Sequence, residues 1–129
     1  MNVAIVCTAL LGLLLFGLGL HVSILRGRFR RSIGHDSSPT DPIHRAVRAH
    51  ANTAEYAPFL ALMFLWFAMR PALPLWITVT ILIATVARFA LVAGLLWGTS
   101  LNRPNPARFA GALFTYLSGL ALAAGLVVG

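Results

Sequence analysis

"RAVRAHANTAEYAPFLALMFLWFAM", residues 45–69, joins a polar run directly to a run that is apolar to its end. Four polar side chains recur there at intervals of 3, 4 and 3 residues and so share one face of a helix: Arg45, Arg48, Asn52 and Glu55. Ionisable groups are rare where a helix enters hydrocarbon, and they usually face the protein interior and pair. The stretch therefore predicts a membrane helix with a polar face that has a structural or a binding role.

The composition of the whole chain also indicates a membrane protein. Of 129 residues, 59% are hydrophobic and only 10% are charged, and the mean hydropathy is +0.85. A soluble domain of this size needs more charged surface. We expect a single all-α domain over residues 1–129, an integral-membrane four-helix bundle of up-down-up-down topology. Its predicted spans are about 3–25, 42–69, 75–97 and 105–128.

The basic residues predict the orientation of this bundle. The ten basic residues are all arginines, and eight of them lie beside the loops that join the first span to the second and the third to the fourth. Only Arg70 lies at the opposite end. The positive-inside rule then puts both basic loops in the cytoplasm and both termini on the non-cytoplasmic side, of the inner membrane in a bacterium. Arginines placed in this way indicate contact with membrane lipids, not a nucleic-acid partner.

Cysteine and histidine give no sign of a metal or disulfide framework. Cys7 is the only cysteine, so no disulfide can form within the chain, and the four histidines lack ligand spacing. In the last span, small residues recur at every fourth position: Ala107, Gly111, Thr115, Gly119 and Ala123. Small stripes allow membrane helices to approach closely, so we expect a helix contact here, more readily within a subunit than between subunits.

Two interpretations of the polar face remain open at this point. Its groups can satisfy one another and lock helices together, with Arg48, Arg88 or a neighbouring subunit's arginine as the partner of Glu55. Alternatively, they form a site for a small anionic ligand, because arginines bind carboxylates bidentately and a glutamate can hold an amine. Pro58 removes an N–H from the helix and favours a local kink beside such a site.

The polar face resembles the hallmark of the MAPEG family, the membrane-associated proteins of eicosanoid and glutathione metabolism. The matching positions are Arg48, Ala49, Asn52, Glu55, Tyr56 and Pro58. The similarity extends to chain length, four spans, an arginine-rich first loop and "ARF" around Arg88.

The resemblance implies a homotrimer that binds glutathione as co-substrate between neighbouring subunits and acts as a transferase or peroxidase on lipophilic small-molecule electrophiles. Carried over by position, six residues would bind glutathione: Arg26, Arg48, His50, Asn52, Glu55 and Tyr56. Either Arg103 or Arg108 would stabilise its thiolate, since a nearby guanidinium lowers the pKa of a thiol. No metal takes part.

The sequence departs from the family pattern on the third span. Synthases of the family carry a Tyr or His one turn after the position of Arg88, and often a Tyr one turn later, where this chain has Leu91 and Leu95. An alternative function is therefore a catalytically silent trimeric binding or scaffold protein of the same fold. A small four-helix exporter is disfavoured, because residues 3–25 contain no carboxylate for proton coupling.

Overall fold

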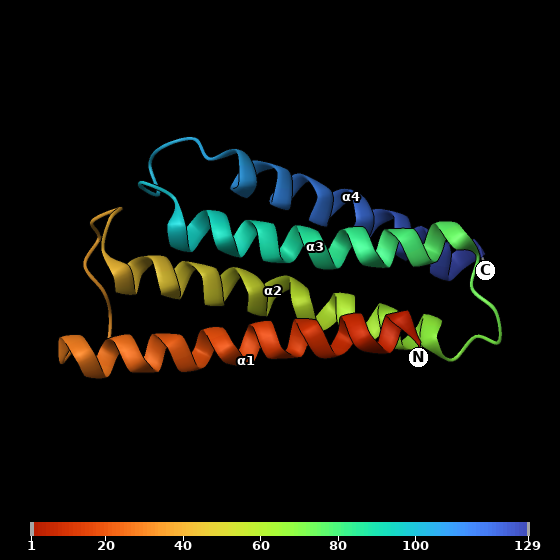
Figure 1. Ribbon diagram of the computed structural model, residues 1–129, viewed down its shortest axis with the longest axis horizontal. Helices are drawn as coiled ribbons and strands as arrows, with labels where there is room; N and C mark the ends of the chain where they lie inside the picture. Colours follow the sequence, from red (N-terminus) through yellow and green to blue (C-terminus); the bar gives the residue numbers. More distant parts are fainter. Residues whose placement is uncertain (1, 129) are drawn as a thin grey trace.

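The computed structural model describes residues 2–128 as four helices joined by three loops (Figure 1). The helices are α1 (Val3–Phe29), α2 (Pro42–Ala68), α3 (Leu75–Trp97) and α4 (Pro106–Val128). No strand occurs within residues 2–128, so the all-α prediction is confirmed for them. The boundaries of α2, α3 and α4 agree with the predicted spans to within one residue.

Local capping chemistry explains where the helices begin and end. Asp41 is the N-cap of α2, and its Oδ2 accepts from the His44 N–H at 2.8 Å, directly before Pro42 at the first helical position. In the same way Asn105 Oδ1 accepts from the Arg108 N–H at 3.0 Å at the start of α4. Helix α1 runs four residues beyond its predicted span and ends at Phe29, and the C-cap residue Arg30 adopts a left-handed conformation with φ of 54°.

Three of the helices have the length and apolarity to cross a membrane. These are α1, α3 and α4, with 27, 23 and 23 residues. Helix α2 has 27 residues but does not match them in apolarity, because its first half carries the polar face. The chain is a multi-pass integral membrane protein in which α2 depends on its neighbours to shield its polar side chains.

The bundle is arranged as two close helix pairs. Helix α1 packs on α2 and α3 packs on α4, while α2 and α3 join the pairs, so α1 and α4 lie on opposite sides (Figure 1). The two ends of the chain lie at one end of the bundle, and the α1–α2 and α3–α4 loops lie together at the other (Figure 1). Arginines from both loops are thus collected at one end of the molecule.

Glycine allows α4 to lie directly on the backbone of α3. A Cβ added to Gly111 would lie 2.5 Å from the Leu91 nitrogen, and one on Gly94 would lie 2.6 Å from the Arg108 nitrogen. The predicted small stripe is correct at Gly111 and Thr115, which are buried.

The outer members of the predicted stripe lie off the α3–α4 contact. Ala107 and Ala123 are exposed, and a Cβ on Gly119 would meet no atom within 4 Å. The buried face alternates steps of four and three residues, as a period of 3.6 requires: Gly111, Thr115, Ser118, Leu122 and Gly125. Residues at a strict spacing of four drift around the helix axis and so leave this buried face.

Substitution of two of the three glycines of α4 tests this packing. We expect Gly111→Ala to lower the free energy of unfolding by about 1–3 kcal/mol, because the new methyl group overlaps the α3 backbone. Gly119→Ala is the matched control, since its methyl group enters open space and alanine favours a helix. Unfolding in detergent micelles measures both variants, and an equal effect of the two would contradict the close contact.

Candidate ligand-binding site

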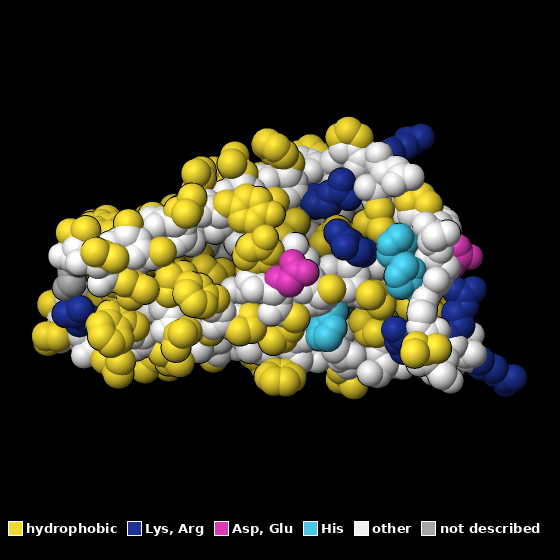
Figure 2. All heavy atoms as spheres, turned by 180° about the vertical axis from the view of Figure 1, so that it is seen from behind, with side chains coloured by type: hydrophobic (Ala, Val, Ile, Leu, Met, Phe, Trp, Pro, Cys, Tyr) yellow, Lys and Arg dark blue, Asp and Glu magenta, His cyan; other side chains and the backbone are white. Residues whose placement is uncertain are grey.

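A cavity of about 440 Å³ lies between α2, α3, α4 and the α3–α4 loop. We call it the arginine pocket, and its lining residues are His44, Arg48, Asn52, Leu91, Leu95, Leu101, Asn102 and Arg108. On the face shown in Figure 2, most of the charged and histidine side chains lie in one half, and the other half is largely hydrophobic. The pocket thus combines residues from three helices with a concentration of polar groups.

The arginine pocket has the electrostatics of an anion site. Arg48 and Arg108 both line it, and none of its lining residues is acidic. Arg108 Nη1 donates to the Leu101 carbonyl at 2.8 Å, which fixes the guanidinium while leaving other donors free. Among residues 2–128, no group accepts a hydrogen bond from the exposed side chain of Arg48. Such a pocket suits a carboxylate, which can accept two parallel bonds from a guanidinium.

The position of Arg108 follows from the packing of α3 and α4. Gly94 of α3 has no side chain, so the first turn of α4 can rest on it at the Arg108 backbone. Arg103, the alternative candidate, is exposed in the α3–α4 loop and does not line the pocket. The two arginines that the sequence left as equal choices therefore have different surroundings.

Arg88 holds α2 against α3 from inside the bundle. Its side chain is 0% exposed, and its Nη2 donates to Asn52 Oδ1 at 2.9 Å and to Thr53 Oγ1 at 3.2 Å. The guanidinium carbon lies 5.6 Å from the centre of the Tyr56 ring, within the range of a cation–π contact. Its Nε and Nη1 are buried without a hydrogen-bond partner in the described part of the chain. The sequence indicated Arg88 as a possible partner of Glu55 and as part of the family similarity, but it did not predict these contacts with Asn52 and Thr53.

Tyr56 and Glu55 continue the polar face beyond the pocket. The Tyr56 ring packs on Tyr116 of α4, with ring centres 5.6 Å apart at a tilt of 52°. Tyr116 was not predicted from the sequence, because an aromatic residue in an apolar helix gives no sign of its neighbour. Glu55 is exposed, and the only ion pair within residues 2–128 joins Arg31 and Asp41 at 3.5 Å. The two partners proposed for Glu55 within the chain do not pair with it.

Besides Glu55, Tyr56 and Arg103, two further sequence-predicted site residues do not line the arginine pocket. Arg26 is in the last turn of α1, where its Nη1 donates to the Gly34 carbonyl at 3.0 Å. His50 is directed toward α1, and its Nε2 lies 3.3 Å from where a Cβ of Gly19 would be. The pocket therefore brings together only Arg48, Asn52 and Arg108 from the predicted set.

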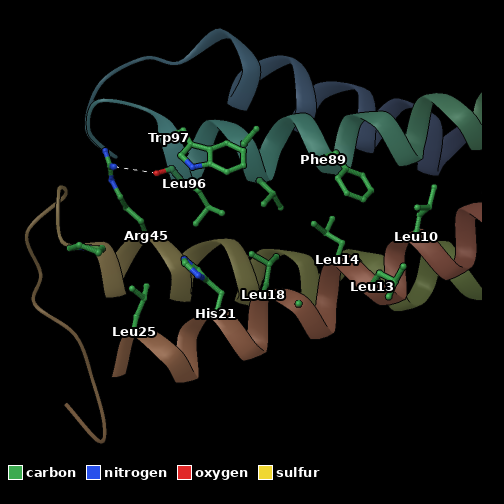
Figure 3. A pocket seen from close by; sticks show the side chains of 14 residues that line it. Leu10, Leu13, Leu14, Leu18, His21, Leu25, Arg45, Phe89, Leu96 and Trp97 are labelled. Atoms are coloured by element: carbon green, nitrogen blue, oxygen red, sulfur yellow. Dashed lines mark hydrogen bonds between the residues drawn. The ribbon is translucent and has the colours of Figure 1, made fainter. Parts of the chain in front are cut away.

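A second cavity, of about 690 Å³, lies between α1 and α3 and is mostly apolar (Figure 3). His21 and Arg45 lie toward one end of it and Leu10 toward the other (Figure 3). Arg45 Nη1 donates to the Leu96 carbonyl at 3.3 Å, and its Nη2 donates to the Gly98 carbonyl. Arg45 thus binds the last carbonyls of α3, where a cation is favourable, and ties the start of α2 to the end of α3.

Comparison with known proteins identifies a family for the chain. The model of the MAPEG family matches residues 4–128, nearly the whole chain, and so confirms the resemblance seen in α2. Neither the search of curated proteins nor the search of solved structures returned a match.

Arg45 and Arg48 lie one turn apart, and the structure gives them different roles. We expect Arg45→Gln to lower the free energy of unfolding by about 1.5–3 kcal/mol, because charge-assisted bonds to α3 are lost. Arg48→Gln should stay within about 0.5 kcal/mol of the parent, because the exposed side chain has no partner to lose. Unfolding without ligand measures both, and a loss at Arg48 as large as at Arg45 would show that Arg48 is structural.

Proposed function

Because this chain belongs to the MAPEG family, we propose that it binds glutathione in the arginine pocket and transfers it, as a homotrimer, to lipophilic electrophiles from the bilayer. The observation that carries the proposal is the convergence of Arg48, Asn52 and Arg108 in one cavity without an acidic residue. Glutathione carries two carboxylates, and each can accept charge-assisted hydrogen bonds there.

The spacing of charges along α2 also suits a tripeptide. At a rise of 1.5 Å per residue, Arg48 and Glu55 are separated by about 10 Å along the helix axis. An extended tripeptide spans roughly the same distance. A carboxylate bound near Arg48 then leaves the ammonium group of glutathione within reach of Glu55, whose exposed carboxylate forms no ion pair within residues 2–128.

A trimer gives Arg26 and His50 a role that a single chain does not. Both lie away from the arginine pocket of their own subunit, on or toward α1. In the proposed assembly they reach the glutathione held by a neighbouring subunit. An up-down-up-down arrangement with the basic loops in the cytoplasm opens the pocket to cytoplasmic glutathione.

In this proposal Arg108 is the catalytic arginine. A guanidinium beside the thiol favours the thiolate and lowers the pKa of the thiol. The thiolate sulfur forms a bond to the electrophilic carbon, and the electron pair of the bond that breaks leaves with the displaced group. Arg103 is exposed outside the pocket and serves as the comparison.

A second candidate function is glutathione binding without catalysis. Leu91 and Leu95 both line the arginine pocket. Their side chains offer no hydrogen bond to a thiolate or a leaving group. This observation favours a trimeric binding or scaffold protein.

Binding measurements test the shared part of both candidates. We expect glutathione to bind the detergent-solubilised protein, and we expect Arg48→Gln and Arg108→Gln each to weaken binding by about 1.5–3 kcal/mol. Arg103→Gln is the matched control and should leave the affinity unchanged. Isothermal titration with all four proteins provides the measurement. Absence of binding to the parent, or equal losses in all three variants, would reject the pocket.

The thiolate absorbance of bound glutathione, followed against pH, separates catalysis from silent binding. For an enzyme, Arg108→Gln raises the pKa of the bound thiol, and the parent conjugates a generic aromatic electrophile. For a silent binder, the thiol pKa is the same with and without Arg108, and the parent shows no conjugation above the rate of free glutathione.

A further inference from the structure

The chemistry of arginine fixes which way the Asn52 amide points. An arginine side chain carries only donors, whereas an asparagine amide has an oxygen that accepts and a nitrogen that donates. Arg88 Nη2 lies 2.9 Å from Asn52 and is fully buried, so only the amide oxygen of Asn52 can face it. The Asn52 nitrogen therefore lies on the opposite side of the Cβ–Cγ axis from the oxygen, away from Arg88.

We propose that Arg88 is a positioning residue that holds Asn52 as a hydrogen-bond donor toward the arginine pocket and thereby makes the pocket selective for carboxylate groups. Asn52 lines that pocket, so an amide turned away from Arg88 presents its two N–H donors there. The identity of the ligand as glutathione rests on the proposed function, but the orientation of Asn52 does not.

The surroundings of Arg88 keep this orientation fixed. The same Nη2 also donates to Thr53 Oγ1 at 3.2 Å, and Thr53 is itself 0% exposed. The guanidinium lies over the Tyr56 ring, one turn further along α2. Rotation of the Asn52 amide would place its N–H groups against a buried cation that has no acceptor. Such a contact is repulsive and leaves polar groups unsatisfied.

Burial of the Arg88 charge also lowers the stability of the fold, which argues against a purely stabilising role for this residue. Its Nε and Nη1 are buried without partners in residues 2–128, and no carboxylate there pairs with its charge. A buried charge without a counter-ion lowers stability. A neutral side chain at position 88 would avoid that cost, but it would leave the Asn52 amide free to present either end to the pocket.

The result is a pocket in which three side chains of α2 and α4 offer donors to a ligand. Arg48 and Arg108 have no acceptor atoms, and Asn52 contributes its amide N–H groups. A carboxylate meets donors from both helices. An ester loses the charge, and an amide or ammonium group brings donors of its own against them. Selectivity for a carboxylate thus depends on a residue that does not touch the ligand.

Asn52→Asp gives a test with two readouts that move in opposite directions. The carboxylate has nearly the shape of the amide, and it supplies Arg88 with the counter-charge that it lacks. We expect the variant to unfold at a higher temperature than the parent in the absence of ligand. It should bind glutathione at least about tenfold more weakly, because an anionic acceptor replaces the donor. Asn52→Leu is the control for loss of the side chain, and it should lower both stability and affinity.

Arg88→Met tests the positioning role itself. We expect the ratio of affinities for glutathione over its diethyl ester to fall in this variant, because the Asn52 amide can then turn its oxygen to the pocket. If Asn52→Asp lowers the unfolding temperature, or if it binds glutathione as the parent does, the inference is wrong while the proposed function stands. If the parent binds no glutathione, the proposed function fails. A lower unfolding temperature of Asn52→Asp would then still reject the contact between Asn52 and Arg88.

Discussion

A single buried guanidinium determines how the second helix sits in this bundle. Arg88 lies within an otherwise apolar α3 and is inaccessible to water, so α2 must turn polar atoms toward it. Asn52 and Thr53 provide those atoms, and Tyr56 provides a ring. This contact fixes the rotation of α2 about its own axis. With that rotation fixed, Arg48 lines the arginine pocket and Arg45 reaches the end of α3.

The close packing of α3 and α4 completes the site. Because Gly94 and Gly111 lack side chains, the two backbones approach to contact, and the first turn of α4 brings Arg108 to the pocket. Residues of one type consequently differ in role by their position alone. Arg45 donates to carbonyls at the end of α3, and Arg88 is fully buried inside the bundle. Arg108 donates to a carbonyl of the α3–α4 loop and also lines the arginine pocket. The number of arginines in a sequence does not reveal this division.

The sequence predicted the elements well because each depends on local chemistry. Apolar runs, Asp41 with Pro42, and Asn105 with Pro106 mark the helices closely, and the spacing of Arg48 and Asn52 indicates their shared site. Features that depend on contacts between helices could not be predicted from the sequence. The partner of Arg88, the packing of Tyr56 on Tyr116 and the different surroundings of Arg103 and Arg108 all depend on the rotation and offset of one helix against another. The stripe through Gly119 was wrong for the same reason, since composition does not give the true packing face.

The central claim is that the arginine pocket recognises the carboxylates of glutathione. Isothermal titration of the solubilised parent protein with glutathione and with its diethyl ester tests this most directly, because the two ligands differ only in those groups. We expect glutathione to bind and the diester to bind at least about tenfold more weakly, the minimum expected from losing a charge-assisted hydrogen bond. Equal affinity for the two ligands would show that the arginines do not recognise the carboxylates, and would contradict the account.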